Sequence, residues 1–254
     1  MAEPRGTVLI TGAAQRIGRA LACDFAARGW RVALHCRASE RQAQELAQEL
    51  GRSGTATAVL RADLADADAV AQLIPACSRQ LGPPTCLINN AAMFAPDAIG
   101  ELDQALWDRQ LAVNLKAPLF LAEAFAKHLP PGVAGNVINI IDQGVLKPTP
   151  QFFSYWVSKA ALWAATRTLA QALAPSIRVN AIGPGPVLQS TYQTEAQFRA
   201  EYEATLLKRR TRPEDIAAAI QFILAAPALT GQMLALDGGQ HLAWQTPDVT
   251  LSGS

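Results

Sequence analysis

Short runs of β-branched and aliphatic residues alternate with longer helical patterns along this chain, and this alternation constrains the fold more than any other feature. Thr7–Ile10 is typical of a buried strand, residues 17–28 of a helix that ends at Gly29, and residues 31–35 of the next strand. Strands that alternate with helices predict a parallel sheet covered on both faces. We therefore expect an α/β fold with a doubly wound parallel sheet of about seven strands, flanked by helices.

The same rhythm continues along the chain, without a composition shift or linker that would mark a domain boundary, so residues 1–254 are predicted to form a single domain. Ser39 and Gln42 have the spacing of a capping box at one helix start, and Pro118 is expected to interrupt a long helical stretch. The remaining strands are expected at 56–60, 86–88, 136–141, 177–179 and 233–236, and the remaining helices at 39–50, 66–82, 102–129, 153–174 and 215–225.

Two segments depart from this rhythm. Residues 186–213 are richer in polar side chains and interrupt the alternation between the sixth strand and the last helix. An insertion at the edge where ligands collect is typical of a substrate-binding lid, which we predict here. Residues 244–254 are predicted to be a polar C-terminal tail.

Composition excludes several classes of function. The chain has 22 Lys and Arg against 21 Asp and Glu, so its net charge of +1 favours neither nucleic acid nor an anionic membrane as a partner. No signal-peptide core is present, and no apolar run approaches the roughly 20 residues that span a bilayer. The 4 cysteines form no C-x-x-C pair, so no metal site is expected. We expect a cytoplasmic protein that acts on a small molecule.

A turn directly after the first strand has the composition of a phosphate-binding loop. Its sequence is Thr11-Gly12-Ala13-Ala14-Gln15-Arg16-Ile17-Gly18. Glycine lets the backbone approach a pyrophosphate, and the following helix offers its N-terminal amides to the phosphate charge. The strict G-x-G-x-x-G fingerprint is absent, so this segment alone is equally compatible with an ordinary strand-to-helix turn.

The end of the second predicted strand lacks an acidic residue. An NAD site usually carries Asp or Glu there to bind the ribose hydroxyls, whereas this chain has Arg37 and Ser39 after His35. A guanidinium at Arg37 or Arg16 suits the extra phosphate of NADP. The pattern therefore favours NADP over NAD, and the alternative is that Arg37 is simply a solvated strand-end residue.

The turn resembles the T-G-x-x-x-G-x-G cofactor loop of the short-chain dehydrogenase/reductase family, with Arg16 in place of the middle glycine. Further matches follow in the family's order, at Asp63-Leu64, Asn89-Asn90-Ala91, Tyr155-x-x-x-Lys159, Ile182-Gly183-Pro184-Gly185 and Leu236-Asp237-Gly238-Gly239. Ala92 stands where the family expects a glycine. The resemblance covers about residues 7–242. It implies a Rossmann-type domain, NADPH/NADP as the cofactor and a homotetramer.

Tyr155 and Lys159 lie four residues apart on a predicted helix, so their side chains share one face. A phenol has a pKa near 10, which makes it a poor proton shuttle at neutral pH. A nearby ammonium stabilises the phenolate, and we therefore expect Lys159 to lower the pKa of Tyr155. Lys159 could also hold the ribose hydroxyls of the cofactor.

Asp142 occupies the position, thirteen residues before Tyr155, where the family commonly carries a serine. A carboxyl group suits a basic ring nitrogen or a developing iminium ion, since reduction of C=N requires a proton at nitrogen. Asp142, Arg16, the H-x-R-x-S segment and Phe94 together resemble the pteridine reductase and dihydromonapterin reductase branch. That resemblance implies that Phe94 stacks on a pterin. It also implies that Asn114 holds a water in a proton relay.

The predicted function is therefore hydride transfer from NADPH to a dihydropterin-like C=N bond. An NADPH-dependent carbonyl reductase of a ketone, quinone or 3-oxoacyl thioester is an alternative that Asp142 disfavours, and a non-catalytic NADPH sensor is a second. The predicted catalytic residues are Asp142, Tyr155, Lys159 and Asn114, and the predicted substrate-binding residues are Phe94, Asp142, Tyr155 and Leu188. The predicted cofactor-binding residues are Gly12, Arg16, Ile17, Gly18, His35, Arg37, Ser39, Asp63, Leu64, Asn90, Ala91, Tyr155, Lys159, Pro184 and Gly185.

Overall fold

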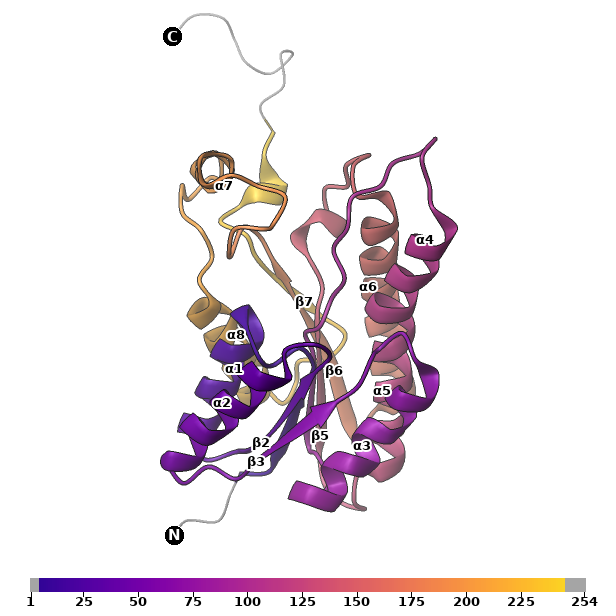
Figure 1. Cartoon of the computed structure of the whole chain (residues 1–254), viewed down its shortest axis with the longest axis vertical. Helices are drawn as coiled ribbons and strands as arrows, with labels where there is room; N and C mark the ends of the chain where they lie inside the picture. Colours follow the sequence, from indigo (N-terminus) through magenta and orange to yellow (C-terminus); the bar gives the residue numbers. More distant parts are fainter. Residues whose placement is uncertain (1–4, 245–254) are drawn as a thin grey trace, which may run out of the picture.

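The computed structural model describes residues 5–244, which form a seven-stranded parallel sheet with helices over both faces (Figure 1). The strands are β1 (Thr7–Ile10), β2 (Arg31–Cys36), β3 (Thr57–Arg61), β4 (Cys86–Asn89), β5 (Gly135–Ile140), β6 (Ile177–Pro184) and β7 (Met233–Leu236). Their order is β3-β2-β1-β4-β5-β6-β7, and each neighbouring pair is parallel. This order reverses between β1 and β4, which confirms the predicted doubly wound α/β fold.

The helices form two layers around the sheet. They are α1 (Arg16–Ala27), α2 (Glu40–Arg52), α3 (Ala67–Leu81), α4 (Gln104–Leu111), α5 (Ala117–His128), α6 (Phe153–Leu173), α7 (Glu195–Glu203) and α8 (Pro213–Ala225). In Figure 1, α1, α2 and α8 cover one face of the sheet, and α3, α5 and α6 cover the other.

Each layer buries its own apolar cluster against the sheet. Leu21 and Phe25 of α1 are completely buried on one face, and Leu121 and Phe125 of α5 are completely buried on the other. Burial of each such side chain contributes about 1.5–3 kcal/mol. Because both faces are covered, the central strands are buried along their whole length, as all four residues of Thr7–Ile10 illustrate.

The long helical stretch is interrupted, but not by a break at Pro118. A π-helical turn, Ala112–Lys116, joins α4 to α5, and Pro118 lies in the first turn of α5. A missing N–H is tolerated at that position. The distortion therefore precedes the proline, and it places Asn114 inside the π turn.

Two other local predictions differ from the structure. The sixth strand is longer than residues 177–179 because it continues to Pro184 beside β7. The predicted capping box at Ser39 is wrong, because no side-chain cap forms there. The Ser39 hydroxyl instead accepts a hydrogen bond from Gln15 Nε2 at 3.1 Å, which joins the first turn to the end of β2.

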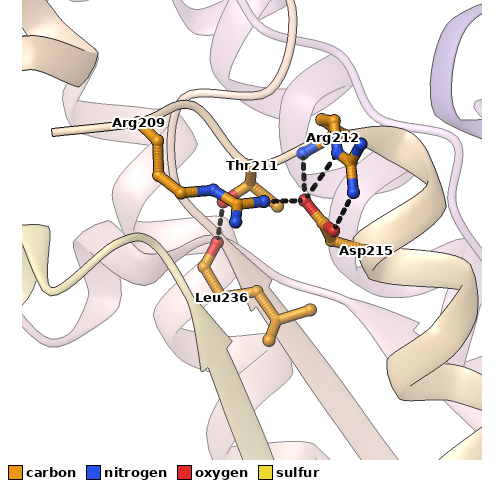
Figure 2. A network of polar contacts seen from close by, with 5 residues as sticks. All are labelled: Arg209, Thr211, Arg212, Asp215 and Leu236. Carbon is orange, nitrogen blue, oxygen red and sulfur yellow. Dashed lines mark hydrogen bonds and ion pairs between the residues drawn. The ribbon is translucent and has the colours of Figure 1, made fainter. Parts of the chain in front are cut away.

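Residues 186–213 leave the sheet after β6, include α7 and end at the start of α8. The two ends of this segment meet, since the Thr211 amide donates to the Pro186 carbonyl at 3.0 Å. Figure 2 shows how the returning end is tied down: Arg209 and Arg212 pair with Asp215 of α8, and the Thr211 hydroxyl donates to the carbonyl of Leu236. The returning end of the segment is thus tied to α8 and to the end of β7.

None of the helices within residues 5–244 combines the length and apolar character needed to cross a membrane. The predicted tail at 244–254 lies outside the described residues, apart from Trp244.

Candidate active site

A cleft of about 650 Å³ opens where the carboxyl ends of the strands meet residues 186–213. In open α/β sheets, ligands bind at this edge near the point where the strand order reverses. Many of the predicted site residues line the cleft, namely Arg16, Ile17, Asn90, Phe94, Asp142, Tyr155, Lys159, Pro184, Gly185 and Leu188.

Asp142 and Tyr155 form a hydrogen-bonded pair at the floor of this cleft. Asp142 follows β5, where its Oδ1 accepts from the Gly144 amide at 2.9 Å and so begins a short 3₁₀ turn. Tyr155 lies in the first turn of α6, and its hydroxyl donates to Asp142 Oδ2 at 3.1 Å. The phenolic hydrogen of Tyr155 therefore lies between the phenol oxygen and the Asp142 carboxyl group.

Burial and mutual interaction shift the proton affinities of three groups here. Burial raises the pKa of Asp142 to about 6, although the Gly144 amide and the Lys159 ammonium oppose this. Burial and the negative charge of Asp142 raise the pKa of Tyr155 well above its usual value. Burial lowers the pKa of Lys159 to about 8. Near neutral pH, Tyr155 thus keeps its proton while Asp142 populates both forms.

The predicted lowering of the Tyr155 pKa by Lys159 is therefore wrong. Lys159 is buried and donates to the carbonyl of Ile140 at 2.8 Å, with its Nζ atom 5.8 Å from the centre of the Tyr155 ring. The hydroxyl instead contacts the Asp142 carboxyl group, which has the opposite effect on the phenol.

Aromatic side chains from three separate segments gather beside this pair. Phe94, after β4, stacks on Phe152 with ring centres 4.3 Å apart and an interplanar angle of 10°. Tyr155 meets Phe94 edge-on at 4.8 Å, and Tyr192 of the 186–213 segment meets both phenylalanines at 6.0 Å. Flat apolar walls of this kind suit a planar ring. The sequence indicated Phe94 alone, because no local pattern reveals that Phe152 and Tyr192 meet it.

The glycine turn after β1 is close-packed and held by the loop after β4. Gly12 has a φ of 64°, which favours glycine. A Cβ atom at Gly18 would overlap the Gly12 carbonyl oxygen and the Asn90 side chain. Asn90 Nδ2 donates to the Thr11 carbonyl at 2.8 Å, and the Thr11 hydroxyl accepts from the Ala91 amide at 3.0 Å. Asn90 and Ala91 thus hold the turn in shape.

Arg16 connects this turn to the 186–213 segment. It stands where the family motif has a glycine, and its φ of 53° is the left-handed conformation a glycine would adopt. Its guanidinium donates to the carbonyls of Leu188 at 2.9 Å and Gln189 at 3.0 Å. α1, which begins here, has no side-chain cap, so its first amides face the turn.

His35 supports the turn from within. It is buried, and burial lowers its pKa to about 4, so the ring is neutral. The geometry assigns Nδ1 as the acceptor from the Gly12 amide at 3.1 Å and Nε2 as the donor to the Ala62 carbonyl at 3.2 Å. In the structure, the His35 side chain holds the turn in place through these two hydrogen bonds, and its predicted contact with the cofactor stays a prediction.

Two residues after β3 also differ from the prediction in what they contact. Leu64 is buried in the apolar cluster that α3 and α5 cover. Asp63 accepts from the Ala65 amide at 3.0 Å and pairs with Arg109 of α4 at 2.7 Å. The sequence gave no indication of Arg109, because this ion pair joins residues 46 positions apart.

Asn114 is buried in the π turn and spans two segments of the site. Its Oδ1 accepts from the Met93 amide at 2.7 Å, while its Nδ2 donates to the Met93 carbonyl at 2.8 Å and to Ser158 Oγ at 3.1 Å. These bonds fix the residue before Phe94 against α6. Asn114 is therefore a positioning residue here, and its part in a proton relay stays a prediction.

Comparisons with known proteins agree with this architecture. The chain matches the model of the family described as enoyl-(acyl carrier protein) reductase over residues 12–241. It is 34% identical to the uncharacterized oxidoreductase YjdA of Bacillus subtilis (strain 168), over 91% of this chain and 95% of that protein. It is 30% identical to a short-chain type dehydrogenase/reductase of Picea abies, over 91% of each chain.

A solved structure is similar to almost the whole chain. FolM alternative dihydrofolate reductase 1 from Brucella canis, complexed with NADP, superposes with a TM-score of 0.94 at 48% identity. The match covers 97% of this chain and 98% of that one.

The fold and the cleft define an oxidoreductase of the doubly wound α/β class. The chain belongs to the short-chain dehydrogenase/reductase family.

Proposed function

We propose that this protein is an NADPH-dependent reductase of a dihydropterin-like C=N bond. The observation that carries this proposal is the hydrogen bond between Asp142 and Tyr155, in which a carboxyl group whose pKa is raised to about 6 by desolvation stands beside a protonated phenol. The 48% identity to a dihydrofolate reductase complexed with NADP supports the same chemistry, since dihydrofolate carries a dihydropterin ring.

The residues around the glycine turn fit NADP. The close contact between Gly12 and Gly18 keeps the turn tight against the start of α1, and the first amides of α1 can neutralise the charge of a pyrophosphate bound beside the turn. Arg37 is exposed directly after β2, at the strand end where an NAD site would usually carry an acidic residue. Buried Lys159 can hold the ribose hydroxyls with the N–H bonds that Ile140 leaves free. When bound, the reduced nicotinamide supplies a hydride.

The Asp142–Tyr155 pair can supply the proton that balances the hydride. When Asp142 is ionised, it accepts the phenolic hydrogen and holds it away from the substrate. When Asp142 is protonated, it can donate to the phenol oxygen, and the phenolic hydrogen can then turn toward the substrate nitrogen. Proton transfer to nitrogen and hydride transfer to carbon together convert C=N to CH–NH.

The aromatic walls fit a planar heterocycle. Phe94, Phe152 and Tyr192 form an apolar aromatic cluster next to Tyr155, and offset stacking of a heterocycle on this cluster would contribute about 1 kcal/mol and fix the ring plane. Leu188 lines the same cleft from residues 186–213, which we propose act as the lid.

The proposed homotetramer would form through the long helices on either side of β5. Phe120 of α5 is 53% exposed, beside an apolar groove between α3 and α5 that includes Val70 and Ala124. An exposed phenylalanine over such a groove is compatible with a subunit interface.

The substrate class is tested by following NADPH oxidation with a dihydropterin, a quinone and an acetoacetyl thioester. The proposal predicts that the dihydropterin is reduced fastest. It also predicts that Tyr155→Phe lowers turnover by at least about 100-fold, because a general acid is lost, while NADPH still binds. Faster reduction of the quinone or thioester would favour the carbonyl reductase alternative. Tight NADPH binding without oxidation of any of the three would favour a sensor.

A further inference from the structure

Glu201 of α7 brings a second carboxyl group into the cleft that Asp142 lines. Its side chain is held from two directions: Gln193 Nε2 donates to Oε2 at 2.7 Å, and Gln240 Nε2 donates to Oε1 at 3.3 Å. One of these amides lies in residues 186–213 and the other after β7. The carboxylate is therefore positioned within the cleft rather than free in solvent.

Within residues 5–244, no Lys, Arg or His forms an ion pair with Glu201. The neighbouring acid of the same helix behaves differently, because Glu203 pairs with Arg199 at 2.7 Å on the exposed side. No cationic side chain of the described residues therefore offsets a negative charge on Glu201, which lines the cavity.

The hydrogen bonds around Glu201 leave acceptor capacity on its carboxylate. Gln193 and Gln240 each donate one N–H to it, one to each oxygen, and a carboxylate oxygen can accept more than one hydrogen bond. Gln240 Oε1 is shielded from solvent and has no hydrogen-bond partner among the described residues, so the acceptor that faces the cleft is the carboxylate. This end of the cleft is therefore complementary to hydrogen-bond donors.

The cationic side chains that line the cleft either donate hydrogen bonds to backbone carbonyls or are exposed to solvent. Arg16 donates to backbone carbonyls of Leu188 and Gln189, and Lys159 donates to that of Ile140. Lys147 is exposed. None of these three forms an ion pair with Glu201, so its field acts on whatever substituent the substrate places there.

We propose that Glu201 determines substrate specificity: it accepts hydrogen bonds from hydroxyl or amino groups on the substituent of the heterocycle and repels substituents that carry a carboxylate. This inference rests on the proposed function, in which Asp142 and Tyr155 serve the reducible ring. A fixed like charge in a partly desolvated cleft disfavours the wrong ligand, which is how specificity by repulsion arises.

The test compares two substrates that share the dihydropterin ring. One is a dihydropterin with a neutral polyhydroxylated side chain, and the other is dihydrofolate, whose tail carries carboxylates. The wild-type enzyme is expected to have the higher kcat/KM for the neutral substrate. In Glu201→Gln, the ratio of kcat/KM for the neutral substrate to that for dihydrofolate is expected to fall by about tenfold or more. The fall should come from a lower KM for dihydrofolate and a higher KM for the neutral substrate, with kcat little changed.

Two further variants separate charge from structure. Glu201→Asp keeps the charge and is expected to retain most of the preference. Glu203→Gln removes a carboxylate from the opposite side of the same helix and is expected to leave both KM values unchanged. If Glu201→Gln changed both substrates equally, or neither, the specificity role would be refuted although the reductase function stood. If the wild-type enzyme reduced neither dihydropterin, both proposals would fail.

Discussion

At the scale of single residues, the contact between Asp142 and Tyr155 decides which group holds the proton. A carboxylate beside a buried phenol keeps that phenol protonated, and burial makes the carboxyl group itself a weaker acid. Both effects keep protons on the pair up to a higher pH, at the place where a reduction consumes one. A serine at position 142 would supply neither a second titrating proton nor a charge.

This pair predicts a specific pH dependence. Only the protonated form of Asp142 releases the phenolic hydrogen to the substrate, so activity is present below its pKa of about 6 and is lost as the pH rises through that value. We expect kcat/KM for the dihydropterin to fall by up to about tenfold per pH unit between pH 6 and 8. In Asp142→Asn this descending limb should vanish from the profile. An identical limb in that variant would assign the titration to another group.

The sequence predicted the positions of Asp142, Tyr155 and Lys159, because fixed spacings on a helix and at a strand end place them together. It did not predict the direction of the phenol's pKa shift. That direction depends on whether the carboxyl or the ammonium group reaches the hydroxyl, which only the packing of α6 against β5 determines.

At the scale of elements, the turn from β1 into α1 depends on a close contact between two glycines. Gly18 lies against the Gly12 carbonyl, and both are held by Asn90 from the loop after β4. The turn therefore has little freedom to accept a larger side chain while keeping the pocket that we propose for the pyrophosphate.

Gly18→Ala should thus weaken both folding and cofactor binding. The added methyl group forces the turn apart, at a cost of about 1–3 kcal/mol in the free energy of unfolding, and NADPH affinity should fall with it. Gly51→Ala is a matched control, since no atom lies within 4 Å of its added methyl and it is helical. That control should stabilise the protein by about 0.5–1 kcal/mol. Denaturant titrations and NADPH fluorescence measure both, and wild-type affinity in Gly18→Ala would contradict the proposed turn.

Most element boundaries followed from apolar periodicity, proline and glycine, and they agree closely with the structure. The π turn at Ala112–Lys116 did not, because its cause is tertiary: Asn114 bonds Met93 and Ser158 rather than a neighbour on its own helix. The same limit explains why Phe152 and Glu201 were missed. Their partners, Phe94 and Gln240, lie in distant segments.

At the scale of the whole molecule, the strand order brings every part of the site to one edge of the sheet. The glycine turn follows β1, Arg37 follows β2, Phe94 follows β4 and Asp142 follows β5 (Figure 1), and residues 186–213 contribute to the cleft at this edge. The cofactor and the substrate would therefore meet across the point where the strand order reverses.

We expect the preference between NADPH and NADH to depend on the side chains at this edge of the sheet. Without an acid at the end of β2, we expect the enzyme to prefer NADPH over NADH. Arg37→Ala should raise the KM for NADPH by about tenfold or more, because one charge-assisted hydrogen bond to the 2′-phosphate is lost, and should leave the KM for NADH unchanged. Steady-state rates with each cofactor measure this. Equal rates with both cofactors in the wild-type enzyme would show that the role proposed for Arg37 is wrong.

The most direct test of the central claim is the substrate preference of Asp142→Ser. The quantity to measure is the ratio of kcat/KM for a dihydropterin to that for an acetoacetyl thioester, both with NADPH. If Asp142 serves reduction of C=N, this ratio should fall by at least about 100-fold in the variant, as expected when a positioned acid is removed. An unchanged ratio would contradict the assignment of Asp142 to pterin reduction.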